Sequence, residues 1–234
     1  MPKKTKKKII LLFGPTASGK SKLALDLCKE FNGEIVNADS MQVYKEVKIL
    51  SARPENDTIK HHLYGFVNVN KNFSTGLWLK HAEKKIKQII KNKKVAFVVG
   101  GTGLYFKALT EGFSEIPNIP KPKVNFKLNS EYILKFPNIF KGVSLNDKQR
   151  IQRAFLVYKH TGKPLWFWQK NNKKIFKPSS FMRIFLQPLK SELEVRIRNR
   201  FTEMLKNGAI KEAENFNRIK PNLMNSSNHI IGLK

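Results

Sequence analysis

Two patterns of apolar residues alternate along the first half of the chain. Short runs with the composition of buried strands occupy residues 9–13, 34–38 and 95–99. Between them, apolar residues recur at helical spacing over residues 20–31 and 77–91. Strands that are separated by helices favour a parallel sheet with right-handed crossovers. The pattern therefore predicts an α/β fold.

The pattern changes in the second half of the chain. Four prolines interrupt residues 117–140, which predicts an insertion or linker. The next helix is expected to have Asn146 or Asp147 as its N-cap and to end at Gly162. Its predicted apolar face consists of Ile151, Ala154, Phe155 and Tyr158.

A late strand over residues 182–186 and a helix from Ser191 are expected to complete the fold. That helix places apolar residues at steps of four, namely Leu193, Ile197, Phe201 and Leu205. We therefore expect three segments. They are the first part of the core at 1–114, a shortened insertion or linker at 115–145, and a helical segment that returns to the core at 146–234.

Charge is the unusual quantity in the composition. The chain has 45 Lys and Arg against 17 Asp and Glu, a formal net charge of +28, while 41 % of its residues are hydrophobic, which suits a globular protein. Chains rich in lysine and asparagine can reflect biased coding, but a field of this strength attracts polyanions whatever its origin. Nucleic acid is the leading partner, ahead of an anionic membrane surface.

The cysteine count and the lengths of the apolar runs indicate in which cellular compartment the protein is expected. The single cysteine, Cys28, excludes a disulfide within the chain and a CxxC metal site. No apolar run approaches the ~20 residues of a membrane span, so we expect no membrane partner. The basic start is followed by an apolar run too short for a signal peptide. We therefore expect a cytoplasmic protein.

The strongest chemical signal is a GxxxxGK[ST] motif between the first predicted strand and the first helix. It consists of Gly14, Pro15, Thr16, Ala17, Ser18, Gly19, Lys20 and Ser21. In this context successive backbone N–H groups wrap a diphosphate, Lys20 neutralises it and Ser21 can hold Mg²⁺. The motif predicts a phosphate site and a P-loop NTPase-like sheet, and it outweighs the alternative of a glycine-rich turn with an incidental lysine.

A second candidate site follows the second predicted strand, at residues 39–44. In an open parallel sheet this strand end faces the same crevice as the phosphate loop. Asp39 could take a proton from an incoming nucleophile or help to hold a metal. An Asp-Ser helix cap explains the same residues equally well on the sequence pattern alone.

A series of motifs resembles the tRNA dimethylallyltransferase family, and these motifs occur in the family's order through nearly the whole chain. They are GPTASGKS, NADSMQVY, the pair His61-His62, VVGGTGLYFKAL, NDKQRIQRA at 146–154, HTGKP at 160–164, an arginine-bearing helix at 193–205, and IGLK at 231–234. That family moves a dimethylallyl group from dimethylallyl diphosphate to the exocyclic amine of the adenine 3′ of the anticodon.

The resemblance implies catalytic roles. Lys20, the loop amides and Mg²⁺ on Ser21 would stabilise the departing diphosphate. Asp39 would be the general base, and Thr102 would lie against the flipped adenine or the diphosphate. Two arginines one helical turn apart, Arg196 and Arg200, would add positive charge near the leaving group. Without the resemblance, a solvated helix face would be the preferred reading of these two arginines.

The resemblance also implies contacts with tRNA, with the chain acting as a monomer. The target adenine would meet Asp39, Ser40, Met41 and Gln42. The anticodon stem-loop would meet Gln149, Arg150, Ile151, Gln152 and Arg153. The aromatic run at 166–168 could be a stacking platform for bases, but local core is the favoured reading.

Three departures from the family pattern leave room for other functions. Residues 49–54 read ILSARP where the family has IGTAKP, the stretch between Gly112 and Asn146 is short, and the family's basic C-terminal motif does not occur. A non-catalytic tRNA-binding remnant would explain the early end of the chain and its charge, but not why Lys20, Ser21, Asp39 and Thr102 are all present. A small-molecule or nucleotide kinase is the other alternative, although residues 117–140 lack the arginines of a kinase lid.

Overall fold

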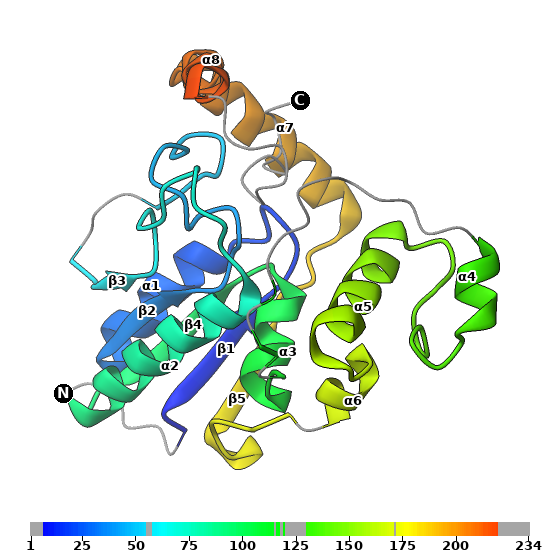
Figure 1. The fold of residues 1–234 in the computed structure, drawn as a ribbon. Coiled ribbons are helices and arrows are strands. Elements are labelled where there is room, and N and C mark those ends of the chain that lie inside the picture. Colours follow the sequence, from blue (N-terminus) through cyan, green and yellow to red (C-terminus); the bar gives the residue numbers. More distant parts are fainter. Residues whose placement is uncertain are drawn as a thin grey trace. The chain divides into compact units, whose positions relative to one another are not determined.

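The computed structural model describes residues 7–54, 58–114, 116–117, 119, 130–170 and 172–219 (Figure 1). These residues form two compact units, of which the first holds the described residues up to Thr110 and from Phe176 onward. The second unit runs from Glu111 to Ile175. The described part of the chain contains no helix long and apolar enough to cross a membrane.

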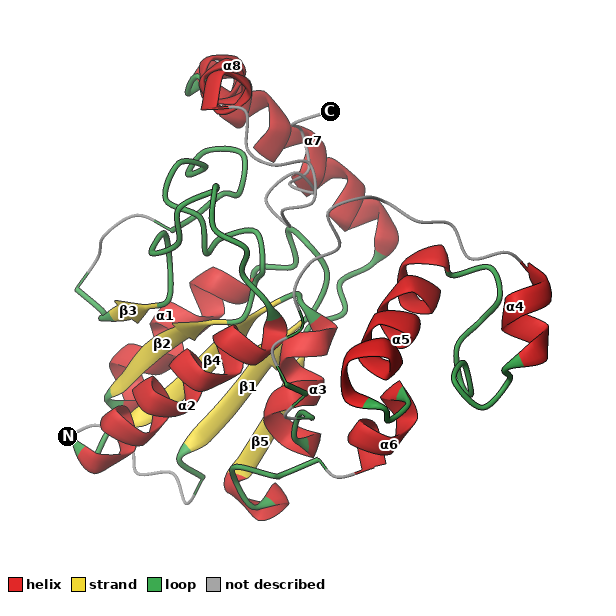
Figure 2. Cartoon of the chain, in the orientation of Figure 1, coloured by secondary structure: helices red, strands yellow, loops and turns green. Residues whose placement is uncertain are grey.

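A five-stranded parallel sheet forms the centre of the first unit (Figure 2). Its order is β3-β2-β4-β1-β5, and every pair of neighbours is parallel. The strands are β1 (Ile9–Phe13), β2 (Gly33–Asn37), β3 (His61–His62), β4 (Val95–Gly100) and β5 (Phe181–Phe185). The α/β fold expected from the sequence is confirmed, and the expected strand ends lie within one residue of the observed ones.

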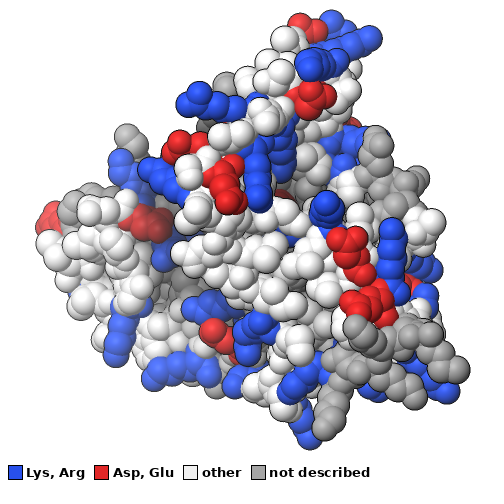
Figure 3. Space-filling model, turned by 180° about the vertical axis from the view of Figure 1, so that it is seen from behind, with Lys and Arg blue, Asp and Glu red and all other residues white. Residues whose placement is uncertain are grey.

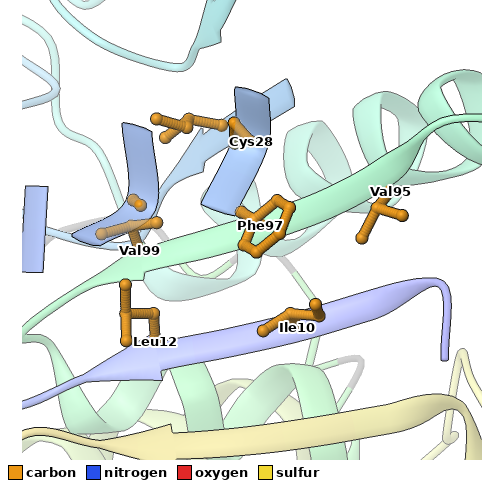
Figure 4. Close-up of a cluster of buried hydrophobic side chains, with 8 residues drawn as sticks. Ile10, Leu12, Cys28, Val95, Phe97 and Val99 are labelled. Carbon is orange, nitrogen blue, oxygen red and sulfur yellow. The ribbon is translucent and has the colours of Figure 1, made fainter. Parts of the chain in front are cut away.

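Helices cover both faces of this sheet. On one face, α1 (Lys20–Phe31) packs Ala24 and Cys28 against alternate residues of three strands, among them Phe97. Figure 4 shows this cluster, in which Phe97 is fully buried between Cys28 and the side chains of β1. Because the ring fills the space beside β2, a Cβ on Gly33 would overlap it. Burial of an aromatic side chain of this size contributes about 1.5–3 kcal/mol.

The second helical layer consists of α2 (Thr75–Lys91) and α3 (Gly103–Glu111). The hydroxyl oxygen of Ser74 caps α2 by accepting the Leu77 N–H at 3.3 Å. The predicted apolar stripe of α2 is buried against β2 and β4 and consists of Trp78, Ala82, Ile86 and Ile89. The Trp78 ring stacks on Tyr105 of α3, with centroids 4.2 Å apart and planes 10° from parallel.

The last elements of the first unit are a short 3₁₀ helix (Pro178–Ser180), α7 (Lys190–Lys206) and α8 (Ala209–Ile219). Within the described part of the chain, no residue of α7 is buried, and Phe201 is 56 % exposed. The predicted apolar stripe of this helix therefore exists in the pattern but lies largely open to solvent. By contrast, α8 buries Ala209 and Phe216.

The second unit contains α4 (Ser130–Lys135), α5 (Lys148–Thr161) and α6 (Leu165–Lys170). Asp147 caps α5 by accepting the Arg150 N–H at 3.0 Å, and Gly162 ends the helix in the left-handed region at φ 67°. Both caps agree with the sequence prediction. Tyr158, however, is 38 % exposed, and Val157 is buried in its place.

The observed boundary of the second unit differs from the segments expected from the sequence. Ile151 and Ala154 of α5 pack in one cluster with Ile133, Ile139 and Phe140. This shared core joins residues 146–161 to the preceding segment rather than to the returning part of the chain. Residues 118 and 120–129 of the proline-rich stretch and the motif at 231–234 lie outside the described residues.

A buried ionic cluster joins β2 to the edge strand β3. The Glu34 carboxylate contacts His62 Nε2 at 2.6 Å and Lys94 Nζ at 2.8 Å. Burial favours a neutral carboxyl, but the hydrogen bonds from Lys94 and His62 outweigh it and hold the pKa of Glu34 below its ordinary value. Burial also lowers the pKa of His62, against the opposing effect of Glu34. The imidazole is therefore neutral and donates from Nε2.

This cluster predicts that the fold loses stability in acid. Because both pKa values are lowered by folding, the unfolded chain binds more protons, and the free energy of unfolding falls as the pH drops below 6.5, the ordinary pKa of histidine. Each group adds at most about 1.4 kcal/mol per pH unit. Denaturant unfolding between about pH 7.5 and about pH 5 measures this slope.

The His62→Gln variant keeps a donor for Glu34 but has no group that titrates near neutrality. Its slope over the same pH range is therefore expected to be shallower than that of the wild type. His160→Gln, which removes an exposed histidine of α5, is the control and should keep the wild-type slope. Equal slopes for His62→Gln and the wild type would contradict the assignment.

Candidate active site

The ends of three adjacent strands bring the predicted site residues together. In a parallel sheet the loops that follow β1, β2 and β4 emerge at the same edge. Thr102, after β4, donates its N–H to Ala38 O at 3.1 Å, and its Oγ1 accepts the Ser40 N–H at 2.9 Å. The turn after β4 is thus bonded directly to the turn that carries Asp39.

The loop after β1 has the conformation of a phosphate-binding loop. Ala17 and Gly19 both lie in the left-handed region, at φ 62° and 90°. Lys20 folds its ammonium back over the loop and donates to Gly14 O at 2.9 Å and Pro15 O at 2.6 Å. These backbone carbonyls hold the cation at the N-terminus of α1, where an anion is favoured by the helix dipole and by unpaired N–H groups.

The charges at this edge are coupled. Burial lowers the pKa of Lys20, while Asp39 raises it and Arg200 lowers it further. Burial likewise lowers the pKa of Arg200, against the raising effect of Asp39. Lys20, Asp39 and Arg200 therefore lie within electrostatic reach of one another. Two cations and one carboxylate give the site a net positive field that suits an anionic ligand.

Asp39 is held by a residue that sequence reasoning had not singled out. Fully buried Asn37 accepts the Asp39 N–H at 2.8 Å and donates to Asp39 O at 2.9 Å and to Leu63 O at 3.0 Å. Trp78 Nε1 in turn donates to Asn37 O at 2.8 Å. Asn37 stands in the NADSMQVY motif, so its place two residues before Asp39 was the available signal.

The Asp39 carboxylate itself is oriented by one hydrogen bond. Its Oδ1 accepts the Met41 N–H at 2.9 Å. Among the described residues, no hydrogen-bond donor to its Oδ2 is found. One oxygen thus fixes the carboxylate and the other is left to accept a proton, which is the arrangement a general base needs.

A pocket of about 580 Å³ adjoins the phosphate loop. Its walls are mostly apolar, with Gly14 and Pro15 at one side and the rings of Phe13, Phe106 and Phe185 nearby. The Phe13 and Phe106 centroids lie 5.4 Å apart. An apolar space beside a phosphate loop suits a ligand that joins a short hydrocarbon to a phosphate group.

The other predicted site residues of the first unit have different environments. Gln42 donates its side-chain amide to Ser51 O and Ala52 O, both at 2.9 Å. Arg196 pairs with Glu192 on its own helix at 3.1 Å and is 47 % exposed. The other predicted arginine, Arg200, interacts electrostatically with Asp39. Arg196 shows the solvated pairing typical of a helix surface.

In the second unit, α5 carries the residues expected to meet RNA. Gln149, Arg150 and Arg153 are exposed, and Gln152 is half-buried. Ile151 is 5 % exposed and its side chain packs in the core of the unit, so a contact of this residue with RNA stays a prediction.

The aromatic run at the end of this unit is half-buried in α6, a helix without buried residues. Lys170 Nζ lies 5.1 Å from the Trp166 ring centroid, and Lys163 Nζ lies 4.5 Å from that of Phe167. The rings therefore carry cations at their faces rather than filling a core.

Figure 3 shows that basic side chains also outnumber acidic ones over one face of the molecule.

Known proteins that are similar in sequence to this chain include several tRNA dimethylallyltransferases. A family model described as IPP transferase matches residues 42–234. The tRNA dimethylallyltransferase of Pelagibacter ubique is 44 % identical over 97 % of this chain and 77 % of its own length. That of Wolbachia pipientis is 35 % identical over 98 % of this chain and 79 % of its own length.

Solved structures agree with the sequence relatives. A eukaryotic dimethylallyltransferase acting on tRNA matches 92 % of this chain with a TM-score of 0.70 at 26 % identity. This chain spans 56 % of that protein's length. The full-length tRNA isopentenylpyrophosphate transferase of Bacillus halodurans matches 97 % of this chain and 75 % of its own, with a TM-score of 0.67 at 27 % identity.

The close packing at the end of β4 yields a prediction. A Cβ on Gly100 would overlap the Ala38 carbonyl group and lie 2.7 Å from Asp39 N, whereas a Cβ on Gly101 would meet only Gly14 O, at 3.7 Å. Gly100→Ala is therefore expected to lower the free energy of unfolding by about 1–3 kcal/mol through overpacking. Gly101→Ala is the matched control, with an expected change within about 0.5 kcal/mol.

Denaturant unfolding of the two variants measures both changes. If Gly100→Ala were as stable as Gly101→Ala, the backbone approach of β4 to the Asp39 turn would not be as tight as described.

Proposed function

The chain belongs to the IPP transferase family of tRNA dimethylallyltransferases, and on that basis we propose that it transfers a dimethylallyl group from dimethylallyl diphosphate to tRNA. The acceptor is the exocyclic amine of the adenine 3′ of the anticodon. The observation that carries the proposal is the bonding of the Asp39 turn to the Thr102 turn at the sheet edge that also holds the phosphate loop. In this proposal a base, an anion site and an apolar pocket would act together at this edge.

The phosphate loop would bind the diphosphate of the donor. Its backbone N–H groups and Lys20 would neutralise the charge that develops as the diphosphate leaves. Arg200, which interacts electrostatically with Asp39 of the same site, would add positive charge for this purpose. The apolar pocket beside Gly14 would take the hydrocarbon end of the donor, so that one ligand satisfies both features.

A magnesium ion at this site would be bound mainly by the diphosphate of the donor and by few groups of the protein. Ser21 is exposed in the first turn of α1, and the described residues contain no group of three or more His, Cys, Asp or Glu that could hold a metal. Mg²⁺ is commonly held by one or two protein groups together with substrate phosphates. Ser21 would be the protein ligand, and the ion would neutralise diphosphate charge.

Asp39 would act as the general base on the adenine amine. The amine nitrogen forms a bond to the first carbon of the dimethylallyl group, the bond from that carbon to oxygen breaks, and the diphosphate leaves with the electron pair. The proton from the amine passes to Asp39 Oδ2. Thr102, bonded to Ser40 at 2.9 Å, would hold the turn against the adenine or the diphosphate.

The acceptor would be the anticodon stem-loop. A base must leave its stack to be modified, and the half-buried residues Ser40, Met41 and Gln42 beside Asp39 would receive it. The exposed residues of α5 and the net charge of +28 would serve phosphate contacts. We propose that the chain acts as a monomer in the cytoplasm. The family assignment gives no support to the kinase alternative, whereas a remnant without catalysis is distinguished by assay.

The decisive variant is Asp39→Asn, which keeps the hydrogen bond from Met41 but removes the base. Removal of a general base is expected to lower kcat by about 10²–10⁴-fold while binding of dimethylallyl diphosphate is kept. Radiolabelled donor, Mg²⁺ and an unmodified tRNA report transfer, and equilibrium dialysis reports donor binding. Asp26→Asn, on the exposed side of α1, is the control and should keep wild-type activity.

Two results would count against the proposal. Transfer by Asp39→Asn at a rate within a few-fold of the wild type would remove Asp39 from the mechanism. Binding of tRNA by the wild type without any transfer would favour the non-catalytic remnant.

A further inference from the structure

One carboxylate of α8 holds three consecutive backbone amides of the 48–52 segment, a loop distant from it in sequence. Glu212 Oε1 accepts the N–H groups of Lys48 at 2.7 Å and Ile49 at 2.9 Å, and its Oε2 accepts that of Leu50 at 2.8 Å. Hydrogen bonds to an ionised acceptor are shorter and stronger than neutral ones. Three successive N–H groups aimed at one anion also fix the local backbone.

A second contact fastens α8 to the same region. Phe216 lies one helical turn beyond Glu212, so both side chains point to the same side of α8. It is 3 % exposed and packs in a cluster with Val43, Tyr44 and Val47, which belong to the segment after Asp39. Glu212 is thus one end of a packed interface and not an isolated surface contact.

The 48–52 segment in turn holds a side chain of the candidate site. Gln42 donates its amide to Ser51 O and Ala52 O, each at 2.9 Å. Both amide donors are used by this segment, so the side-chain oxygen of Gln42 is the atom left to accept a hydrogen bond from a substrate. Ala52 lies in the left-handed region at φ 46°, a conformation that needs support from its surroundings.

We propose that Glu212 is a positioning residue that sets the orientation of Gln42 through the 48–52 segment. The path runs from the carboxylate to the three amides, through the carbonyls of Ser51 and Ala52, to the Gln42 amide three residues after Asp39. Without the negative charge the shared acceptor is weaker and keeps only one accepting oxygen for the three amides, so the segment relaxes. The Gln42 oxygen then no longer presents a fixed acceptor to the target base. The part of this inference that concerns the base depends on the function proposed above.

The first test is kinetic and uses the full chain. Glu212→Gln removes the charge but keeps the size, and it is expected to raise KM for tRNA about tenfold, as the loss of one well-oriented hydrogen bond would. KM for dimethylallyl diphosphate is expected to stay at the wild-type value, because the phosphate loop is not part of the path. Glu214→Gln, an exposed glutamate of the same helix, is the matched control and should change neither constant.

A double-mutant cycle separates positioning from general destabilisation. If Glu212 acts through Gln42, then adding Glu212→Gln to Gln42→Ala produces little further loss of kcat/KM for tRNA. A merely structural role of Glu212 would instead give losses that multiply. Multiplying losses, or an equal rise in KM for both substrates, would overturn the proposal.

Hydrogen exchange tests the structural link without any catalysis. The amides of Lys48, Ile49 and Leu50 are expected to exchange at least about tenfold faster in Glu212→Gln than in Glu214→Gln, because each has lost its charged acceptor. Unchanged exchange at these amides would contradict the link, whatever the chain transfers. A chain that transfers nothing but shows the faster exchange would refute the proposed function and leave the Glu212 link intact.

Discussion

The approach of β4 to the end of β2 is the contact on which the site depends. The Ala38 N–H donates to Val99 O at 2.8 Å, and the Thr102 N–H donates to Ala38 O at 3.1 Å. The segments that follow β2 and β4 therefore stay paired beyond the ends of the strands. Gly100 makes this possible because a side chain there would overlap the Ala38 carbonyl. As β1 pairs with the other side of β4, the phosphate loop, the Asp39 turn and the Thr102 turn are forced to one edge.

This edge combines three environments that the proposed reaction requires. A diphosphate needs cations and N–H groups, which Lys20 and the start of α1 offer, and a hydrocarbon needs the apolar walls next to Gly14. The weakly nucleophilic amine needs a base, and the Asp39 carboxylate, which the hydrogen bond from Met41 orients, would take that role in the proposed reaction. Buried Asn37, at the end of β2, bonds to the Asp39 backbone, so the core of the sheet fixes the position of this residue.

The spacing of apolar residues and the capping residues at helix ends made most strands and helices predictable from the sequence. Four strands of the sheet, β1, β2, β4 and β5, follow from apolar runs, and the caps of α5 follow from Asp147 and Gly162, which act locally. The two-residue β3 has no pattern of its own, because only its pairing with Ile35 and Val36 defines it. The burial of Ile151 depends on which face of α5 meets α4, and the position of Gln42 depends on Glu212, 170 positions later in the chain. Such tertiary contacts leave no mark in a short sequence window.

Identification of the modified nucleoside tests the central claim most directly. The purified chain, dimethylallyl diphosphate, Mg²⁺ and an unmodified tRNA would be incubated, and the tRNA would then be digested and its nucleosides separated by mass. The account predicts one adenosine with a dimethylallyl group in place of a hydrogen on its exocyclic amine, located 3′ of the anticodon. A tRNA whose adenosines all keep their original mass, recovered from a complex with the folded protein, would contradict it.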